Sequence, residues 1–121
     1  VVEAAGERPT VIGLVYDHRS RVVRHPAYLH AAATRARARG GIPNYPLAGW
    51  PFAPIRYRIA PPRAFEDEWR PDRFDLATMG MAYDHFLGRG RAPEAVFGER
   101  LGRDLVVSAR AADWWLVRRR P

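Results

Sequence analysis

The chain has 121 residues, a formal net charge of +7 and no cysteine. This length fits one domain, and 47% hydrophobic with 27% charged residues is typical of a globular rather than a disordered protein. The lack of cysteine excludes disulfides, thiol catalysis and cysteine-metal sites. No apolar run reaches the roughly 20 residues that span a bilayer, and the start VVEAAGERP does not have the pattern of a signal peptide.

The positive charge comes from twenty basic residues, and all of them are arginine. A GC-rich genome, whose codons favour Arg, Ala, Gly and Pro, accounts for the lack of lysine. The charge would still attract phosphates or acidic surfaces, so it supports affinity for anions, although weakly. Because the chain starts on two valines without an initiator Met, we expect it to be a piece of a longer protein.

A strand and a helix are predicted in the first third of the chain. TVIGLVYD (10–17) is a continuous apolar run rich in β-branched residues, which is typical of a strand buried on both faces. Helix formers dominate residues 25–39, Pro26 suits the first helical position, and two glycines follow the last arginine. A strand followed by such a helix is the first half of a βαβ unit.

The middle of the chain is predicted to be less regular. IPNYPLAGWPFAP (42–54) contains four prolines and should form no regular element, yet its three aromatic residues should keep it packed over the sheet. IRYRI (55–59) alternates apolar residues with arginine, a pattern that predicts a short, half-exposed strand. An irregular connection follows, with one helical turn near residues 73–77.

The last third is predicted to contain a strand (82–90), a helix (92–102) and an antiparallel hairpin whose runs are separated by Ala111-Ala112. We therefore predict one compact α/β domain over residues 1–121. It has a mixed sheet with βαβ units and a C-terminal antiparallel hairpin. The expected sheet core is Val11, Ile12, Leu14, Val15, Phe86, Leu87, Leu105, Val106 and Leu116.

The tripeptide Tyr-Asp-His occurs twice, at residues 16–18 and 83–85. The first copy follows the end of a predicted strand, where α/β sheets commonly place ligand-binding loops. The second copy begins a strand, so we do not expect the two copies to form a symmetric site.

The stretch after the first copy is the candidate anion site. Its arginines precede the predicted helix start near Pro26, where backbone N–H groups and the helix dipole favour negative charge. The planar fork of arginine suits phosphate and carboxylate. The same stretch would equally serve as a solvated surface, with its arginines free or paired with Glu66–Glu68. The candidate anion-binding residues are Asp17, His18, Arg19, Arg21, Arg24 and His25.

Other chemistry has less support. His25 and His30 lie five residues apart, a poor spacing for shared metal binding on one helix face. Ser20 lacks a nucleophile motif, and nothing places Glu66–Glu68 opposite a second carboxylate. We predict no catalytic residue, no metal and no cofactor. The pair Trp114-Trp115 should pack on opposite faces of its strand.

Several segments carry a family resemblance: VIGLVYDHRSRVVRHPAYLHAAATRARARGG, PIRYR, WRPDRFD, YDHFLGRG and DWWLVRR. Together they resemble the soluble C-terminal part of bacterial multi-pass membrane proteins of the glycosyltransferase-like group, which are similar to polyprenyl-phosphate-sugar-dependent mannosyltransferases. The resemblance implies that sugar transfer takes place elsewhere in the parent protein, so no catalytic residue is carried over to this chain.

The resemblance thus implies a non-catalytic extramembrane accessory domain, with weak binding of an anion or phosphate as a further expectation. Its partners would be the membrane-embedded part of the same parent chain and a lipid-linked sugar phosphate. The alternative is a stand-alone basic module that binds nucleic acid or another polyanion.

Overall fold

A mixed sheet forms the centre of the domain. The computed structural model describes residues 10–26, 28, 30–43, 52, 54 and 70–121. In this part of the chain a five-stranded sheet has the order β2-β1-β3-β5-β4. The strands are β1 (Thr10–Val15), β2 (Ile42–Pro43), β3 (His85–Arg89), β4 (Leu105–Ala111) and β5 (Trp114–Arg119).

Parallel and antiparallel pairs divide the sheet into two halves. β1 is parallel to both β2 and β3, whereas β5 is antiparallel to both β3 and β4. The parallel pair β1 and β2 is joined through a helix, and β4 and β5 form a hairpin at the end of the chain. The predicted α/β class, with its mixed sheet and C-terminal antiparallel hairpin, is therefore confirmed.

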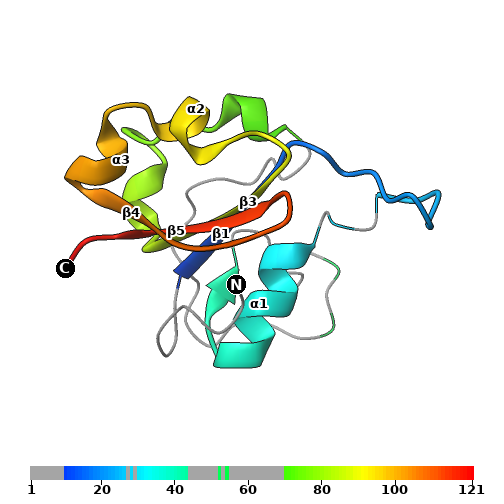
Figure 1. The fold of residues 1–121 in the computed structure, drawn as a ribbon. Helices are drawn as coiled ribbons and strands as arrows, with labels where there is room; N and C mark the ends of the chain where they lie inside the picture. Colours follow the sequence, from blue (N-terminus) through cyan, green and yellow to red (C-terminus); the bar gives the residue numbers. More distant parts are fainter. Residues whose placement is uncertain (1–9, 27, 29, 44–51, 53, 55–69) are drawn as a thin grey trace.

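Helices cover both faces of the sheet (Figure 1). The helix α1 (Ala31–Arg39) lies on one face. The short helices α2 (Pro93–Phe97) and α3 (Arg100–Arg103) lie on the other face, together with the 3₁₀ turns η3 (Pro71–Arg73) and η4 (Gly80–Ala82). Each strand in the middle of the sheet is thus buried on both sides, which explains the continuous apolar run of β1.

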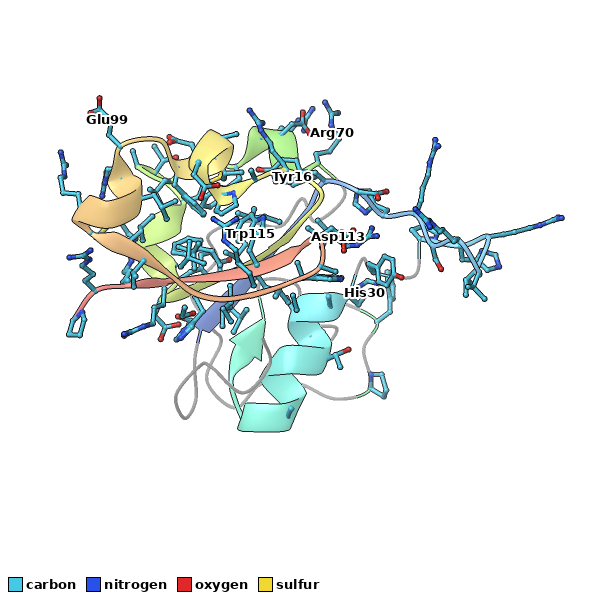
Figure 2. The ribbon with its side chains drawn as sticks, viewed as in Figure 1. Tyr16, His30, Arg70, Glu99, Asp113 and Trp115 are labelled. Atoms are coloured by element: carbon cyan, nitrogen blue, oxygen red, sulfur yellow. The ribbon has the colours of Figure 1, made fainter. Side chains whose placement is uncertain are left out.

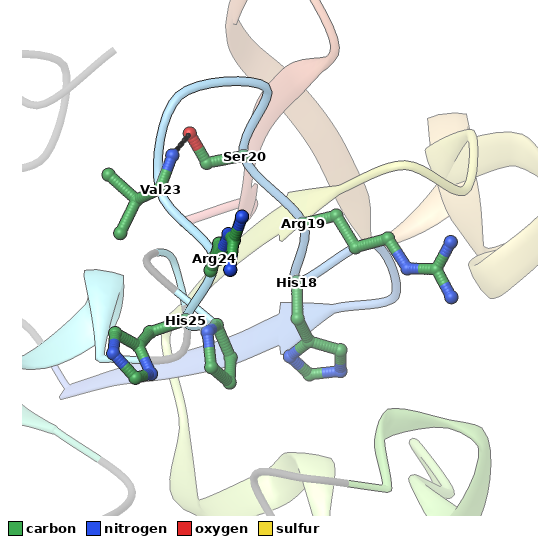
Figure 3. A pocket seen from close by; sticks show the side chains of 7 residues that line it. His18, Arg19, Ser20, Val23, Arg24 and His25 are labelled. Atoms are coloured by element: carbon green, nitrogen blue, oxygen red, sulfur yellow. Dashed lines mark hydrogen bonds between the residues drawn. The ribbon is translucent and has the colours of Figure 1, made fainter.

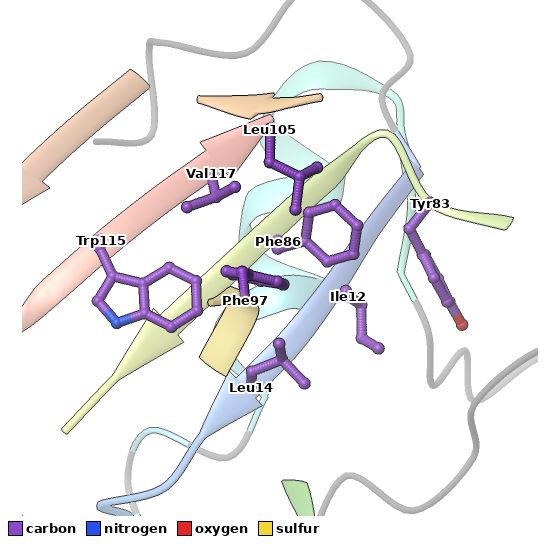
Figure 4. Close-up of a cluster of buried hydrophobic side chains, with 8 residues drawn as sticks. All are labelled: Ile12, Leu14, Tyr83, Phe86, Phe97, Leu105, Trp115 and Val117. Atoms are coloured by element: carbon purple, nitrogen blue, oxygen red, sulfur yellow. The ribbon is translucent and has the colours of Figure 1, made fainter. Parts of the chain in front are cut away.

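The buried side chains alternate between these two faces. Ile12 and Phe86 belong to the cluster under α2, whereas Val11 and Leu87 belong to the cluster under α1. Eight of the nine predicted core residues are buried, and only Val106 is half-buried. The larger cluster, drawn in Figure 4, consists of Ile12, Leu14, Tyr83, Phe86, Phe97, Leu105, Trp115 and Val117.

Aromatic rings fill the core on the α2 side. The ring centroid of Phe97 lies 5.2 Å from that of Phe86 and 5.7 Å from that of Trp115, both with edge-to-face geometry. The Trp115 ring lies over Gly88, its partner across the β3–β5 pair. A side chain at position 88 would collide with the six-membered part of the Trp115 ring. Glycine is therefore required there by packing.

Two predicted helices have different limits in the structure. The first begins at Ala31 rather than near Pro26. Tyr28 accepts a hydrogen bond from the Ala31 N–H (3.2 Å) as part of a turn, and its ring packs edge-to-face on Trp114, so tertiary contacts hold this segment outside the helix. The predicted helix 92–102 is broken after Phe97, because Gly98 has a φ of 53°, which no α-helix accommodates.

The proline-rich segment also departs from its prediction. Ile42–Pro43 forms β2 beside β1, although no regular element was expected there. Phe52, expected to pack, is 91% exposed. Tyr45, Trp50 and the predicted strand 55–59 lie outside the described residues.

The close contact at Gly88 gives a stability prediction. Gly88→Ala should lower the free energy of unfolding by about 3 kcal/mol, because the new methyl group displaces the Trp115 ring. In a Trp115→Leu background the same substitution should cost less than about 1 kcal/mol, since the colliding ring is gone. Urea unfolding followed by circular dichroism measures both differences. An equal cost in the two backgrounds would contradict this packing.

Candidate functional site

The two Tyr-Asp-His copies lie at opposite ends of the sheet. β1 and β3 are parallel, with Val11 opposite His85 and Val15 opposite Arg89. The first copy follows the end of β1, whereas the second leads into the start of β3. The prediction that they do not form a symmetric site is confirmed.

The second copy has a structural role at the amino end of β3. The His85 ring is buried, and its Nδ1 lies 2.8 Å from Asp84 Oδ1. Arg119 donates from Nε to the Tyr83 carbonyl (2.9 Å) and from Nη2 to the Gly80 carbonyl (2.8 Å). The Asp84 N–H donates to Thr10 Oγ1 at 3.0 Å. These bonds join η4, β1, β3 and β5, so this end of the sheet is held by its own polar groups.

The first copy meets Arg89, the last residue of β3. The Arg89 side chain is only 11% exposed, and its Nη1 lies 3.0 Å from Asp17 Oδ2. The Nη1 group also donates to the Asp17 carbonyl (2.5 Å) and to the Arg19 carbonyl (3.2 Å). On the other side, Nη2 lies 2.7 Å from Asp113 Oδ2 in the β4–β5 turn. One guanidinium thus joins the end of β1, the end of β3 and the turn of the hairpin.

Aromatic rings complete the surroundings of Arg89. The guanidinium carbon lies 4.2 Å from the centroid of the Tyr28 ring and 5.8 Å from that of Trp114. Trp114 packs with the cluster under α1, whereas Trp115 is buried in the cluster on the opposite face. The prediction that the two tryptophans use opposite faces is confirmed.

Gly90 allows the chain after β3 to lie close to Asp17, whose carboxylate pairs with Arg89. It has a φ of +89°, and a Cβ there would lie 2.8 Å from the Asp17 Cβ. Its N–H donates to the Asp113 carbonyl at 3.3 Å. Ala112 lies beside Asp113 in the β4–β5 turn and has a φ of 52°, a backbone conformation that costs about 1 kcal/mol in a residue with a side chain. The contacts of Asp113 with Arg89 and Gly90 offset that cost and fix the hairpin turn at 112–113.

Residues 18–26, here called the arginine loop, leave the sheet directly after Asp17. Asp17 Oδ1 accepts the Arg19 N–H at 3.0 Å, and Ser20 Oγ accepts the N–H groups of Val22 (3.1 Å) and Val23 (3.2 Å). These local bonds give the backbone two successive turns. Figure 2 shows the loop extending away from the body of the domain, beyond the end of β1.

Side chains of the arginine loop line a hollow of about 450 Å³ that is open to solvent. Figure 3 shows the rings of His18 and His25 on the same side of the loop, below Arg24, with the Arg19 side chain extending outward. The lining residues are His18, Arg19, Ser20, Val23, Arg24, His25 and Pro26.

The hollow contains four of the six residues predicted for the anion site, namely His18, Arg19, Arg24 and His25. Arg21 is exposed and does not line it, and Asp17 binds Arg89 instead. The hollow also lacks the expected helix N-terminus, because α1 begins only at Ala31. Ser20 and Val23 were not predicted, since their part in the hollow depends on how the loop turns.

The electrostatics around Asp17 favour its charged form. The Arg19 N–H and then the Arg89 guanidinium hold the pKa of the Asp17 carboxyl below its usual value. No other acidic residue occurs in 17–26. Within 17–26 the Asp17 carboxylate is therefore the acidic group, and it is ionised and already paired with a cation, whereas Glu66–Glu68 lie outside the described residues.

Metal binding and membrane crossing have no support in this part of the chain. Among the described residues, no three His, Asp or Glu side chains come together in a way that could hold a metal ion. Nor does any helix within the described ranges have the length and apolar character to cross a bilayer.

The role of Arg89 can be tested by removing its charge. Arg89→Met should lower the free energy of unfolding by about 2–3 kcal/mol, because it leaves Asp17 and Asp113 without their partner. Arg91→Met is the matched control, since Arg91 lies two positions away and its guanidinium carbon lies 5.5 Å from the centroid of the Tyr16 ring. Its cost should stay below about 1 kcal/mol. Similar losses in both variants, measured by urea unfolding, would contradict the central role of Arg89.

The lowered pKa of Asp17 predicts a pH dependence. A carboxyl whose folded pKa is depressed stabilises the protein above its unfolded pKa of about 4, and this contribution is lost as the pH falls through the folded pKa. Asp17→Asn should therefore be less stable than wild type at pH 7, and the gap should narrow below about pH 4. Urea unfolding across this pH range measures the gap. A gap that stays constant down to the acid limit would show that ionisation of Asp17 is not responsible.

Comparisons with known proteins found no match: no family model, no curated protein and no solved structure matches the chain.

Proposed function

We propose that this chain is a non-catalytic binding domain whose arginine loop binds a phosphate-bearing anion. The observation that carries the proposal is the hollow, where two arginines, two histidines and a serine hydroxyl line one side of a loop without a single acidic residue. The likeness of the sequence to glycosyltransferase-like membrane proteins supports a wider role as an extramembrane accessory domain in a bacterial parent protein.

The side chains of the hollow suit phosphate better than other ligands. Arginine donates up to five hydrogen bonds in a planar fork that matches two oxygens of a phosphate. Ser20 Oγ accepts two backbone N–H groups, which leaves its own proton available for an acceptor. Because the hollow is open to solvent, it suits a small exposed anion or the head of a longer molecule rather than a ligand enclosed on all sides.

A catalytic role has weaker support. Ser20 Oγ stabilises the turn of its own loop through its two accepted bonds. His85, the buried histidine, lies at the far end of the sheet beside Asp84 and away from the hollow. A serine nucleophile needs an adjacent base and donors for an oxyanion. His18 and His25 line the hollow with Ser20, but the Ser20 hydroxyl is held by two backbone N–H groups of its own loop rather than by an imidazole base.

The parent-protein context suggests the ligand. A lipid-linked sugar phosphate presents the anionic group that the hollow suits, and the membrane-embedded part of the same chain would hold it nearby. The second candidate is binding of nucleic acid or another polyanion, which the net charge of +7 and the exposed arginines at 118 and 120 favour. A polyanion would need several separated arginines at once, whereas the hollow offers one compact site.

The hollow predicts unequal roles for two arginines of the same loop. Arg24→Ala should weaken binding of pyrophosphate about tenfold, the value of a lost charge-assisted hydrogen bond. Arg21→Ala removes the same charge from outside the hollow and should weaken binding less than about threefold at ordinary ionic strength. Titration of phosphate and pyrophosphate by calorimetry or NMR measures both affinities.

Equal losses in the two variants would show that net charge rather than the hollow binds the anion. Affinity that rises steadily with the length of a polyanion, and far beyond pyrophosphate, would favour the second candidate.

A further inference from the structure

The arginine loop exposes apolar side chains at its tip. Val22 is 92% exposed and Val23 is 45% exposed, and the two valines are adjacent in the chain. Arg21 precedes them and Arg24 follows them. Residues 21–24, here called the tip of the loop, thus combine an apolar pair with a cation on each side, on a loop that Figure 2 shows extending from the body of the domain.

Anion binding alone does not explain these valines. Val23 lines the hollow, but the Val22 side chain lies almost entirely in water and does not line it. The backbone N–H groups of both residues are held by Ser20 Oγ, so the turn itself keeps the pair at the tip. An isolated exposed valine is ordinary, whereas an apolar pair fixed between cations on a projecting loop is suited to a surface with matching layers.

We propose that the tip of the arginine loop docks on an anionic lipid surface. The side chains of Val22 and Val23 enter the boundary between headgroups and acyl chains, and Arg21 and Arg24 bind lipid phosphates beside them. The proposal rests on the anion affinity of the same loop, and it names the partner as a membrane leaflet. Because Arg24 also lines the hollow, binding of Arg24 to lipid phosphates would bring the hollow near headgroup level, where a lipid-linked phosphate is presented.

A lipid surface fits the loop better than a nucleic acid does. A nucleic acid would bind the arginines through its phosphates but would leave the Val22 side chain in water. A bilayer places negative charge beside an apolar layer, and the tip likewise places Arg21 and Arg24 beside the two valines. Among the described elements the loop extends beyond the end of β1, which favours contact of its tip with a flat surface.

The experiment measures partitioning of the 121-residue chain onto vesicles by sedimentation. One set of vesicles is pure phosphatidylcholine, and the other contains about one third phosphatidylglycerol as the anionic lipid. Wild type should bind the anionic vesicles weakly and reversibly, with binding detectable at millimolar lipid and reduced by salt. It should bind the neutral vesicles at least about tenfold less, because each arginine near an anionic surface contributes roughly fivefold.

The variant Val22→Ser/Val23→Ser separates this proposal from simple charge attraction. It keeps every arginine and should lose at least about tenfold in vesicle partitioning, since it removes the apolar groups that enter the bilayer. The single variant Val22→Ser, which leaves the lining of the hollow intact, should lose part of the vesicle binding and keep the wild-type affinity for pyrophosphate. Met81→Ser is the matched control, because Met81 is 72% exposed at the other end of the sheet, and its vesicle binding should equal that of wild type.

Each result has one meaning. Vesicle binding by Val22→Ser/Val23→Ser equal to that of wild type overturns the lipid proposal, as does tighter binding to a single-stranded oligonucleotide than to anionic vesicles. If Arg24→Ala leaves pyrophosphate binding intact while the valine variant still loses vesicle binding, the proposed hollow fails and the docking tip stands.

Discussion

The ion pairs of Arg89 are the interaction on which the rest of this structure depends. Parallel strands β1 and β3 end side by side, so the chain leaves both strands at the same end of the sheet. Arg89 fixes that exit, because it pairs with Asp17 after β1 and with Asp113 in the hairpin turn. A nearly buried arginine needs such partners, since an unpaired buried charge is strongly destabilising. The cation therefore determines where the arginine loop begins and how the hairpin turns.

Arg119 has a similar structural role at the opposite end of the sheet. Arg119 binds backbone carbonyls at the amino end of β3, where the second Tyr-Asp-His copy lies, and that end is closed by structural bonds. At the opposite end the bonds of Arg89 are also structural, but there the chain continues into a projecting loop. One copy of the tripeptide thus lies at the end of the sheet that is held by the bonds of Arg119, and the other lies at the end from which the arginine loop extends. A short repeated motif therefore does not have to mean a repeated function.

The sequence was sufficient for the parts of the fold that follow from apolar patterning. The run in β1, the alternation in β5 and the hairpin were predicted because each depends on neighbours along the chain. The start of α1 was not, since Tyr28 is held outside the helix by Trp114 and Arg89, which are distant in sequence. Exposure of Phe52 was missed for a related reason, because composition does not show which aromatic residues find a surface to cover.

The candidate site was predicted in part, and what the sequence did not show was the place of Ser20 and Val23 in its lining and the pairing of Asp17 with Arg89 beneath it. The arginines of the loop were visible from their clustering, but the sequence did not show that Arg21 would not line the hollow. A signal for Arg89 was present: an arginine between two glycines at the end of an apolar run. Gly88 makes room for the Trp115 ring and Gly90 for Asp17, so the glycines mark a strand end packed on both sides. A charged residue in such a position must have partners from elsewhere in the chain.

The same pairing connects the fold to the proposed binding site. Asp17 is the carboxylate nearest to the hollow in sequence, and an ionised Asp17 facing the loop would attract Arg19 and Arg24 and reduce their affinity for an anion. Its pairing with Arg89 instead directs the negative charge toward the sheet. From the loop, the Asp17 carboxylate accepts the backbone N–H of Arg19, which shapes the first turn of the loop. Arg89 thus stabilises the strand ends and also leaves the field of the loop positive, so the basis of the proposed anion binding lies in the fold beneath the loop.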